Sequence, residues 1–217
     1  MTDRITRQDF AHMIAAAASK IREQHARLSQ LDCVAGDGDH GASMLRTMDR
    51  LEQAFAKDAN LKSCFCDAGW NVMGADGGAS TSLLGAFFLG IGEGASAAES
   101  WNCSDLADAF RAGLRAVEIQ TKARPGDKTM MDALAPAVQA MSNSAANGKD
   151  IDESVAQAAR AASGGADATK DMIAKYGRAR LLGDKTLGSQ DAGAASVALI
   201  FDGFARALTT HTGERNA

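Results

Sequence analysis

The chain has 217 residues, of which 46% are hydrophobic and 23% charged, and its formal net charge is −4. A chain of this length and composition can bury one full core, which predicts a single soluble domain over residues 1–217. The acidic balance and the lack of a basic run argue against nucleic acid as a partner. The charged N-terminus and the shortness of the most apolar run, 82–91, argue against a signal peptide and a membrane span. We therefore expect a cytoplasmic protein with reduced cysteines.

Helical periodicity recurs along almost the whole chain, which contains only two prolines. Each predicted helix has one apolar stripe, and that stripe must be buried against neighbouring helices. The sequence therefore predicts an all-α bundle of eight amphipathic helices. Their expected ranges are 7–29, 41–58, 61–75, 79–94, 104–121, 128–145, 151–175 and 191–210.

The loop between the first two predicted helices, 31–41, contains three carboxylates close together: Asp32, Asp37 and Asp39. Like charges repel one another, and a bound cation would remove the conflict. Oxygen ligands alone favour Mg²⁺ or Ca²⁺ over zinc, and the closing glutamate of a calcium EF-hand is missing. A helix N-terminus beside such an ion would suit a phosphate. The alternative is a plain turn, because Asp and Gly are common in turns and helix caps.

Two of the other loops also precede predicted helices. In 74–80, successive glycines would let the backbone approach an anion, and Ser80 could donate a hydroxyl. In 122–129, Lys128 stands at a predicted helix start, where the helix dipole disfavours a cation. It therefore either faces a negative group or is a solvated surface side chain.

The last loop, 177–193, carries three cations among four glycines. It is longer than a helix connection needs, which indicates a functional lid that could fold over phosphates. A solvated surface loop is the alternative.

Four motifs, taken together, resemble the nucleotide-binding, DhaL-type subunits of the dihydroxyacetone kinases. They are Gly36-Asp37-Gly38-Asp39-His40-Gly41, Gly77-Gly78-Ala79-Ser80, Pro125-Gly126-Asp127-Lys128-Thr129-Met130 and Gly177-Arg178-Ala179. They occur in the family's order and spacing, over essentially the whole chain. The resemblance implies a closed barrel of eight antiparallel helices with the nucleotide site at one end.

The resemblance also implies roles for individual residues. Asp32, Asp37 and Asp39 would hold two Mg²⁺ ions at the phosphates of ATP or ADP. Asp37 and Arg178 would carry the catalytic role. The implied nucleotide contacts are His40, Gly41, Ala42, Ser43, Ala79, Ser80, Thr121, Met130, Arg178, Asp191 and Ala192. The chain departs from many relatives by having Ala42-Ser43 for Leu-Asn, Ala192 for Pro, and Gly183-Asp184-Lys185 for Gly-Glu-Arg.

The implied activity is phosphoryl transfer to a small ketose held on a separate DhaK-type subunit, so that the isolated chain should be inactive. Three alternatives stay open. The chain could keep ADP bound and be recharged by a phosphotransferase-system protein. The ketose could be erythrulose. The chain could instead be a nucleotide-sensing module that binds a transcription regulator. The resemblance also leaves a homodimer open.

Overall fold

The computed structural model describes residues 2–57 and 59–215, with side chains described up to residue 209. The described residues form eight α-helices, two 3-10 helices and two very short strands. The elements are β1 (Ile5–Thr6), α1 (Arg7–Cys33), α2 (His40–Phe55), α3 (Leu61–Met73), α4 (Ala79–Gly94), β2 (Ser100–Trp101), α5 (Cys103–Gln120), α6 (Met131–Ala146), α7 (Ile151–Ala168), η1 (Thr169–Asp171), η2 (Arg178–Thr186) and α8 (Ala192–Arg215). The predicted all-α fold is confirmed.

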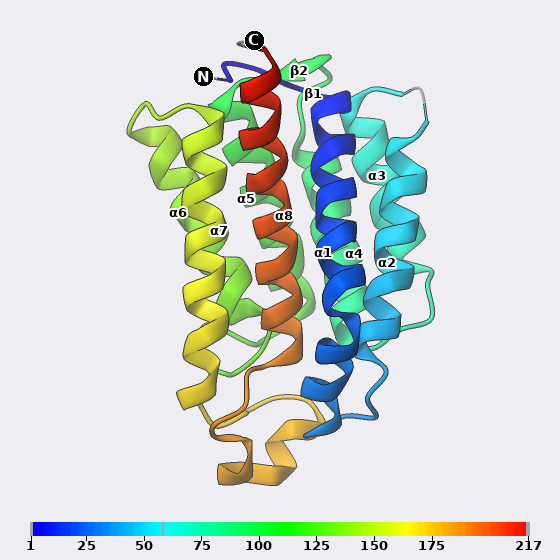
Figure 1. The fold of residues 1–217 in the computed structure, drawn as a ribbon, viewed down its shortest axis with the longest axis vertical. Helices are drawn as coiled ribbons and strands as arrows, with labels where there is room; N and C mark the ends of the chain where they lie inside the picture. Colours follow the sequence, from blue (N-terminus) through cyan, green and yellow to red (C-terminus); the bar gives the residue numbers. More distant parts are fainter. Residues whose placement is uncertain (1, 58, 216–217) are drawn as a thin grey trace.

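The eight α-helices form a closed ring of antiparallel neighbours (Figure 1). Each helix packs against the next one in the sequence, and α1 packs against α8 to close the ring. All eight contribute apolar side chains to one buried core cluster. The apolar stripes that the sequence predicts thus share a common interior.

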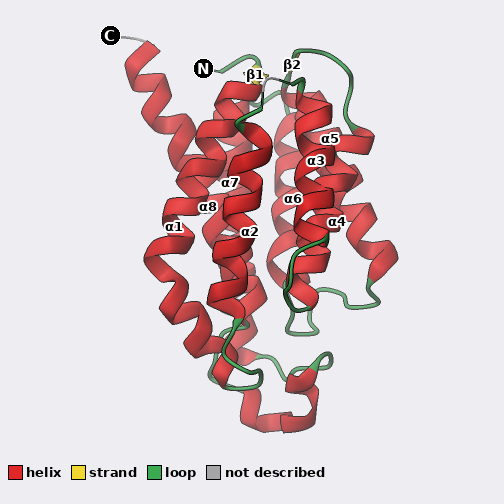
Figure 2. Ribbon diagram, turned by 90° about the vertical axis from the view of Figure 1, so that its right-hand side faces the viewer, coloured by secondary structure: helices red, strands yellow, loops and turns green. Residues whose placement is uncertain are grey.

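The ring has two different ends. Helices α1, α3, α5 and α7 begin at the upper end in Figure 1, beside the β1–β2 pair, and α2, α4, α6 and α8 begin at the lower end. The four connections at the lower end are 34–39, 74–78, 121–130 and 169–191. Figure 2 shows these loops together below the bundle. Each of these connections overlaps one of the four candidate loops predicted from the sequence. The fold therefore brings all four candidate loops to the same end of the bundle.

Side-chain caps secure the helices that begin at the upper end. The side-chain oxygens of Thr6, Asn60, Asn102 and Asp150 each accept a hydrogen bond from a backbone N–H in the first turn of α1, α3, α5 and α7, respectively. Each cap satisfies a donor that the helix itself leaves unpaired. In β1–β2, Ile5 pairs with Trp101, which joins the start of α1 to the start of α5.

Aromatic side chains pack beneath these caps. The ring of Phe65 lies edge-on to those of Phe10 and Phe55, with centroids 4.9 Å apart in both pairs, and is stacked with Trp101 at 5.5 Å. All four side chains are fully buried. This cluster joins α1, α2, α3 and β2 through contacts that aromatic rings prefer.

The predicted seventh helix, 151–175, is wrong at its C-terminal end. Helix α7 ends at Ala168, and η1 carries the chain only as far as Asp171. The side chain of Thr169 explains the stop. Its Oγ1 donates to the Ala166 carbonyl at 2.6 Å and accepts from the Asp191 N–H at 2.9 Å, which ties the chain to the start of α8.

The predicted sixth helix also begins three residues too early. Helix α6 begins at Met131, because the carboxylate of Asp132 accepts hydrogen bonds from the Gly126 and Thr129 N–H groups, at 2.5 and 2.7 Å. Those bonds hold residues 126–129 in a turn. The remaining helix ends lie within five residues of their predicted positions.

Helix α8 contains a window, Ala192–Thr209, that is long and apolar enough to cross a membrane by length and composition. Within the bundle, 67% of that window is buried. Burial against other helices is what a core helix of such a ring requires.

Candidate functional site

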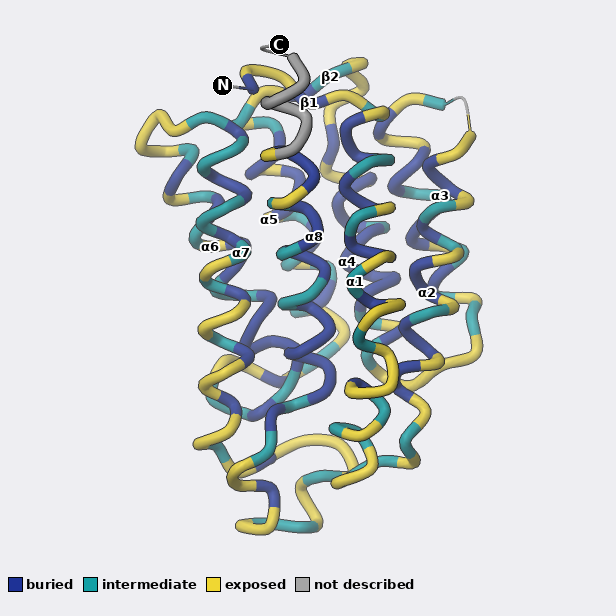
Figure 3. Tube along the Cα trace, in the orientation of Figure 1, coloured by how far each residue is buried: buried dark blue, intermediate teal, exposed yellow. Residues whose placement is uncertain are grey.

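The three carboxylates of the 31–41 loop converge at the lower end of the bundle. One oxygen from each of Asp32, Asp37 and Asp39 lies within 4.8 Å of the others. Asp32 is partly buried, whereas Asp37 and Asp39 are exposed. Figure 3 shows that many residues in the loops at this lower end of the bundle are exposed. A cluster of carboxylate oxygens, with neither nitrogen nor sulfur, fits a hard cation such as Mg²⁺.

Close backbone packing gives this loop its shape. The Asp32 carbonyl accepts from the Gly36 N–H at 2.5 Å, and its carboxylate accepts from the Gly38 N–H at 2.9 Å. A Cβ at position 36 would lie 2.1 Å from an Asp32 carboxylate oxygen, and Gly38 has a φ of +77°. A side chain at position 36 would displace the Asp32 carboxylate, and the backbone at position 38 favours glycine, so the two glycines allow the chain to fold around Asp32.

A cation from the lid lies against this cluster. We define the lid as residues 170–188, which include η2. Nη1 of Arg178 lies 2.9 Å from Oδ2 of Asp37, and both side chains are more than half exposed. The hydrogen bond from Arg178 lowers the pKa of Asp37 below its usual value, so the carboxylate is charged at neutral pH. The guanidinium supplies the donor geometry that suits a phosphate.

A cavity of about 310 Å³ lies beside the acidic cluster. Its volume is at the lower end of the range for small-molecule sites. Eight of the residues that the sequence assigns to metal or nucleotide binding line it. They are Asp32, Ala79, Ser80, Thr121, Met130, Arg178, Asp191 and Ala192.

Gly193 shows how closely the starts of three helices meet. A Cβ at this position would lie 3.0 Å from the Ser80 Oγ and 3.2 Å from the Met130 Cβ. The structure therefore brings together the beginnings of α4, α6 and α8, which are far apart in the sequence.

The four residues predicted at the start of α2 do not line this cavity. His40 is buried, and its Nε2 lies 3.2 Å from the Ser196 Oγ on α8; burial lowers the pKa of this imidazole. The Gly41 N–H donates to Ser29 at 3.2 Å. The Ser43 hydroxyl accepts from Arg46 at 2.9 Å. Ala42 is exposed. A phosphate contact here would rest on the N-terminus of α2 and not on these side chains.

Three of the helices that begin at this end have no side-chain cap. Within the described residues, Asp39, Gly78 and Met130 precede α2, α4 and α6, and none accepts a capping hydrogen bond. For α8, the Asp191 carboxylate accepts from the Ala194 N–H at 2.7 Å. The Ser29 hydroxyl accepts from the Gly41 N–H of α2, and the Thr129 hydroxyl accepts from the Met131 N–H of α6, at 3.2 Å in both cases. The positive ends of the helix dipoles at this end of the bundle favour an anion.

Two further ionisable groups, Lys128 and Asp191, line the cavity. Burial raises the pKa of Asp191 to about 6. Lys128 is buried, and burial lowers the pKa of its ammonium. Lys128 is therefore not the solvated lysine that the sequence allowed. Its ammonium group donates hydrogen bonds to two backbone carbonyl oxygens, those of Thr169 and Ser189.

Several lining residues were not predicted from the sequence. They include Tyr176, Thr186, Ser189 and Gln190, all on or beside the lid. A weak signal existed for Tyr176, because it is the only tyrosine in the chain and directly precedes Gly177-Arg178. Thr186 and Gln190 face the cavity only because the lid turns back toward α8, which local sequence does not reveal.

Several known proteins are similar to this chain. The family model described as DAK2 domain matches residues 34–206. A Listeria innocua protein named "PEP-dependent dihydroxyacetone kinase 1, ADP-binding subunit DhaL" is 35% identical, over 84% of this chain and 87% of its own length. The Escherichia coli protein of corresponding name is 30% identical, over 89% of this chain and 93% of its own length.

Longer relatives match as well. The L-erythrulose kinase of Pectobacterium atrosepticum is 33% identical over 93% of this chain, which spans only 36% of the kinase. The crystal structure of the dihydroxyacetone kinase from C. freundii in complex with AMP-PNP and Mg²⁺ superposes with a TM-score of 0.68 at 26% identity, covering 90% of this chain and 33% of that one. This chain therefore belongs to the DAK2 domain family, which includes the DhaL-type subunits of the dihydroxyacetone kinases.

Proposed function

We propose that this chain is the magnesium- and nucleotide-binding subunit of a dihydroxyacetone kinase. The observation that carries the proposal is the meeting of Asp32, Asp37 and Asp39 beside a cavity that Arg178 of the lid also lines. The donor set fits magnesium, and uncapped helix N-termini fit phosphates. Relatives that are 30–35% identical along most of their length carry the name of the ADP-binding subunit.

Each part of the site has a role in phosphoryl transfer. The three carboxylates would hold two Mg²⁺ ions at the nucleotide phosphates, which Ser80 and the start of α2 would contact. Mg²⁺ held by these carboxylates would offset the charge that develops on the phosphates during transfer. Arg178 lies against the acidic cluster, where its guanidinium can donate to a phosphate oxygen. The walls formed by Thr121 and Met130 would surround the adenine.

The acceptor is a small ketose on a separate DhaK-type subunit, so this chain has no activity alone. Dihydroxyacetone is the first candidate, because the relatives with the highest mutual coverage bear that name. Erythrulose is the second, because erythrulose kinases also match. The four cysteines are free, which suits a cytoplasmic location for the complex.

A phosphocarrier is a second candidate function. In that case ADP stays bound and is rephosphorylated by a phosphotransferase-system protein. The names of four relatives support it, since they read PEP-dependent or PTS-dependent. The ATP-dependent form would instead exchange its nucleotide at each turnover.

Two measurements test these proposals. The chain should phosphorylate dihydroxyacetone with Mg-ATP, or with phosphoenolpyruvate and phosphotransferase proteins, only when a DhaK-type subunit is added. Full activity of the isolated chain would contradict the subunit assignment. Denaturing the purified chain and identifying the released nucleotide separates the donors. Near-stoichiometric ADP favours the phosphocarrier, and an empty site that binds Mg-ATP favours the exchanging kinase.

A further inference from the structure

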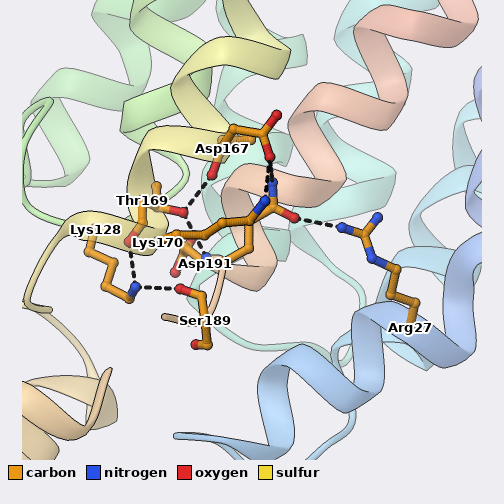
Figure 4. A network of polar contacts seen from close by, with 9 residues as sticks. Arg27, Lys128, Asp167, Thr169, Lys170, Ser189 and Asp191 are labelled. Atoms are coloured by element: carbon orange, nitrogen blue, oxygen red, sulfur yellow. Dashed lines mark hydrogen bonds and ion pairs between the residues drawn. The ribbon is translucent and has the colours of Figure 1, made fainter. Parts of the chain in front are cut away.

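Lys128 is a buried cation between two parts of the chain. Its Nζ donates to the Thr169 carbonyl at 2.5 Å and to the Ser189 carbonyl at 2.6 Å (Figure 4). Only 5% of the residue is exposed. Thr169 directly precedes the lid, and Ser189 directly follows it. One ammonium group therefore joins both ends of the lid.

The backbone closes the base of the lid at the same place. The Gly188 N–H donates to the Lys170 carbonyl at 2.8 Å, and the Asp191 N–H donates to the Thr169 hydroxyl at 2.9 Å. Figure 4 shows Lys128, Ser189, Thr169 and Asp191 gathered around this closure. The lid is thus a loop whose two ends meet, and Lys128 contacts both.

The backbone at Lys128 indicates that its side chain is needed there. Its φ is +58°, and it is the only non-glycine residue with a positive φ among those the structure describes. That conformation is costly for a lysine, and glycine or asparagine would adopt it more readily. Burying an ammonium adds a second cost. The turn itself requires neither a long side chain nor a charge, so the two carbonyl contacts are what the lysine provides.

We propose that Lys128 is a positioning residue that anchors the base of the lid and so holds Arg178 over the acidic cluster. The inference depends on the proposed function in one respect: it assumes that the molecule bound beneath the lid is a nucleotide. The same connection between α5 and α6 makes a second attachment. The Lys175 N–H donates to the Asp127 carbonyl at 3.1 Å, and the Lys175 Nζ donates to the Gly126 carbonyl at 3.0 Å.

Lys128→Met tests the anchor, because methionine keeps much of the side-chain length and loses the charge and the donors. Hydrogen exchange is measured on the protein without nucleotide. The amides of Ala174, Gly188 and Asp191, which bond within the lid or at its base, should exchange at least about tenfold faster than in the wild type. Amides in the first half of α5, at the opposite end, should keep their wild-type rates.

Two further variants serve as controls. Lys122→Met removes an exposed lysine from the same connection and should leave the lid amides unchanged. Lys128→Arg keeps a positive charge and several N–H donors at the anchor, so it should restore part of the protection. It also keeps the test informative if Lys128→Met does not fold.

Nucleotide release provides the functional readout. A fluorescent ADP analogue bound with Mg²⁺ should dissociate at least about tenfold faster from Lys128→Met than from the wild type, in step with faster lid exchange. Wild-type lid exchange in Lys128→Met would overturn the inference, and so would equal acceleration at both ends of the bundle. Faster release with an unchanged lid would also overturn it, since Lys128 would then contact the nucleotide directly. A wild type that binds no nucleotide would refute the proposed function and leave the exchange test standing.

Discussion

The two ends of the bundle differ in how their helices begin. At the end that holds β1 and β2, the four helices that begin there carry side-chain caps. At the other end, α2, α4 and α6 begin without side-chain caps within the described residues. Of the seven residues described with positive φ, all but Gly148 lie in the connections at this second end.

This difference separates stability from function. Capped helix starts satisfy their own backbone donors, and packed aromatic rings leave little for a ligand to bind. Uncapped helix starts, clustered carboxylates and strained turns leave charge and donors unmatched, which a ligand can satisfy. Substitutions at the first end should therefore change stability, and substitutions at the second should change binding and activity.

Phe65→Ala should cause the largest loss of stability. The side chain is buried among Phe10, Phe55 and Trp101, and truncating a buried phenylalanine typically costs about 3–5 kcal/mol. Denaturant unfolding measures the loss. Below the unfolding transition, the affinity for Mg-ADP should remain that of the wild type. A large loss of affinity in the folded variant would show that the two ends are not independent.

Asp37→Asn should cause the largest loss of function. It removes one charge from the acidic cluster and should lower phosphoryl transfer with the partner subunit by about 10²-fold or more, even at saturating Mg²⁺. Stability should change little, because Asp37 is exposed. Steady-state kinetics and thermal unfolding measure the two effects. Unchanged transfer would sink the assignment of Asp37 as a metal ligand.

Asp191→Asn should reveal the cost of the buried carboxyl. Because the pKa of Asp191 is raised from 3.8 to about 6, the folded protein binds this proton more tightly than the unfolded chain does. The stability that it contributes is complete below about pH 4 and is lost as the pH rises to about 6. Asparagine can still accept from the Ala194 N–H and does not titrate.

The stability of Asp191→Asn relative to the wild type should therefore increase between pH 4 and pH 6, by about 1–3 kcal/mol, and then level off. Denaturant unfolding at several pH values measures the difference. A difference that does not vary with pH would show that the Asp191 carboxyl is not shifted.

Asn102→Ala should have the smallest effect of the four substitutions. It removes the cap of α5, where the side-chain Oδ1 of Asn102 accepts from the Asp105 N–H at 2.9 Å. Such a loss costs about 1 kcal/mol of stability. Nucleotide affinity and activity should match the wild type, and a clear decrease in either would break the division between the two ends.

The sequence predicted the elements better than their connections. Periodicity placed α4 correctly at 79–94, because its apolar face and flanking glycines are local signals. It extended α7 beyond Ala168, because nothing local reveals that Thr169 bonds to Asp191 on the other side of the lid. It also placed the start of the fifth helix at residue 104, whereas α5 begins at Cys103 and is capped by Asn102.

The same limit applies to the site. The carboxylates of Asp32, Asp37 and Asp39 were predictable, because they lie within eight residues of one another. The burial of Lys128 was not, since it depends on carbonyl groups 41 and 61 residues away in the sequence. Contacts of that kind arise only when the lid folds back onto the bundle.

Calorimetric titration of ADP into the nucleotide-free chain, with and without Mg²⁺, tests the central claim most directly. We expect tight binding that requires Mg²⁺, and loss of that binding in a variant with Asp32, Asp37 and Asp39 all replaced by asparagine. ADP binding that is equally strong without Mg²⁺ or in the triple variant would contradict the claim that the acidic loop holds a magnesium-bound nucleotide, and so would the absence of binding to the folded wild type.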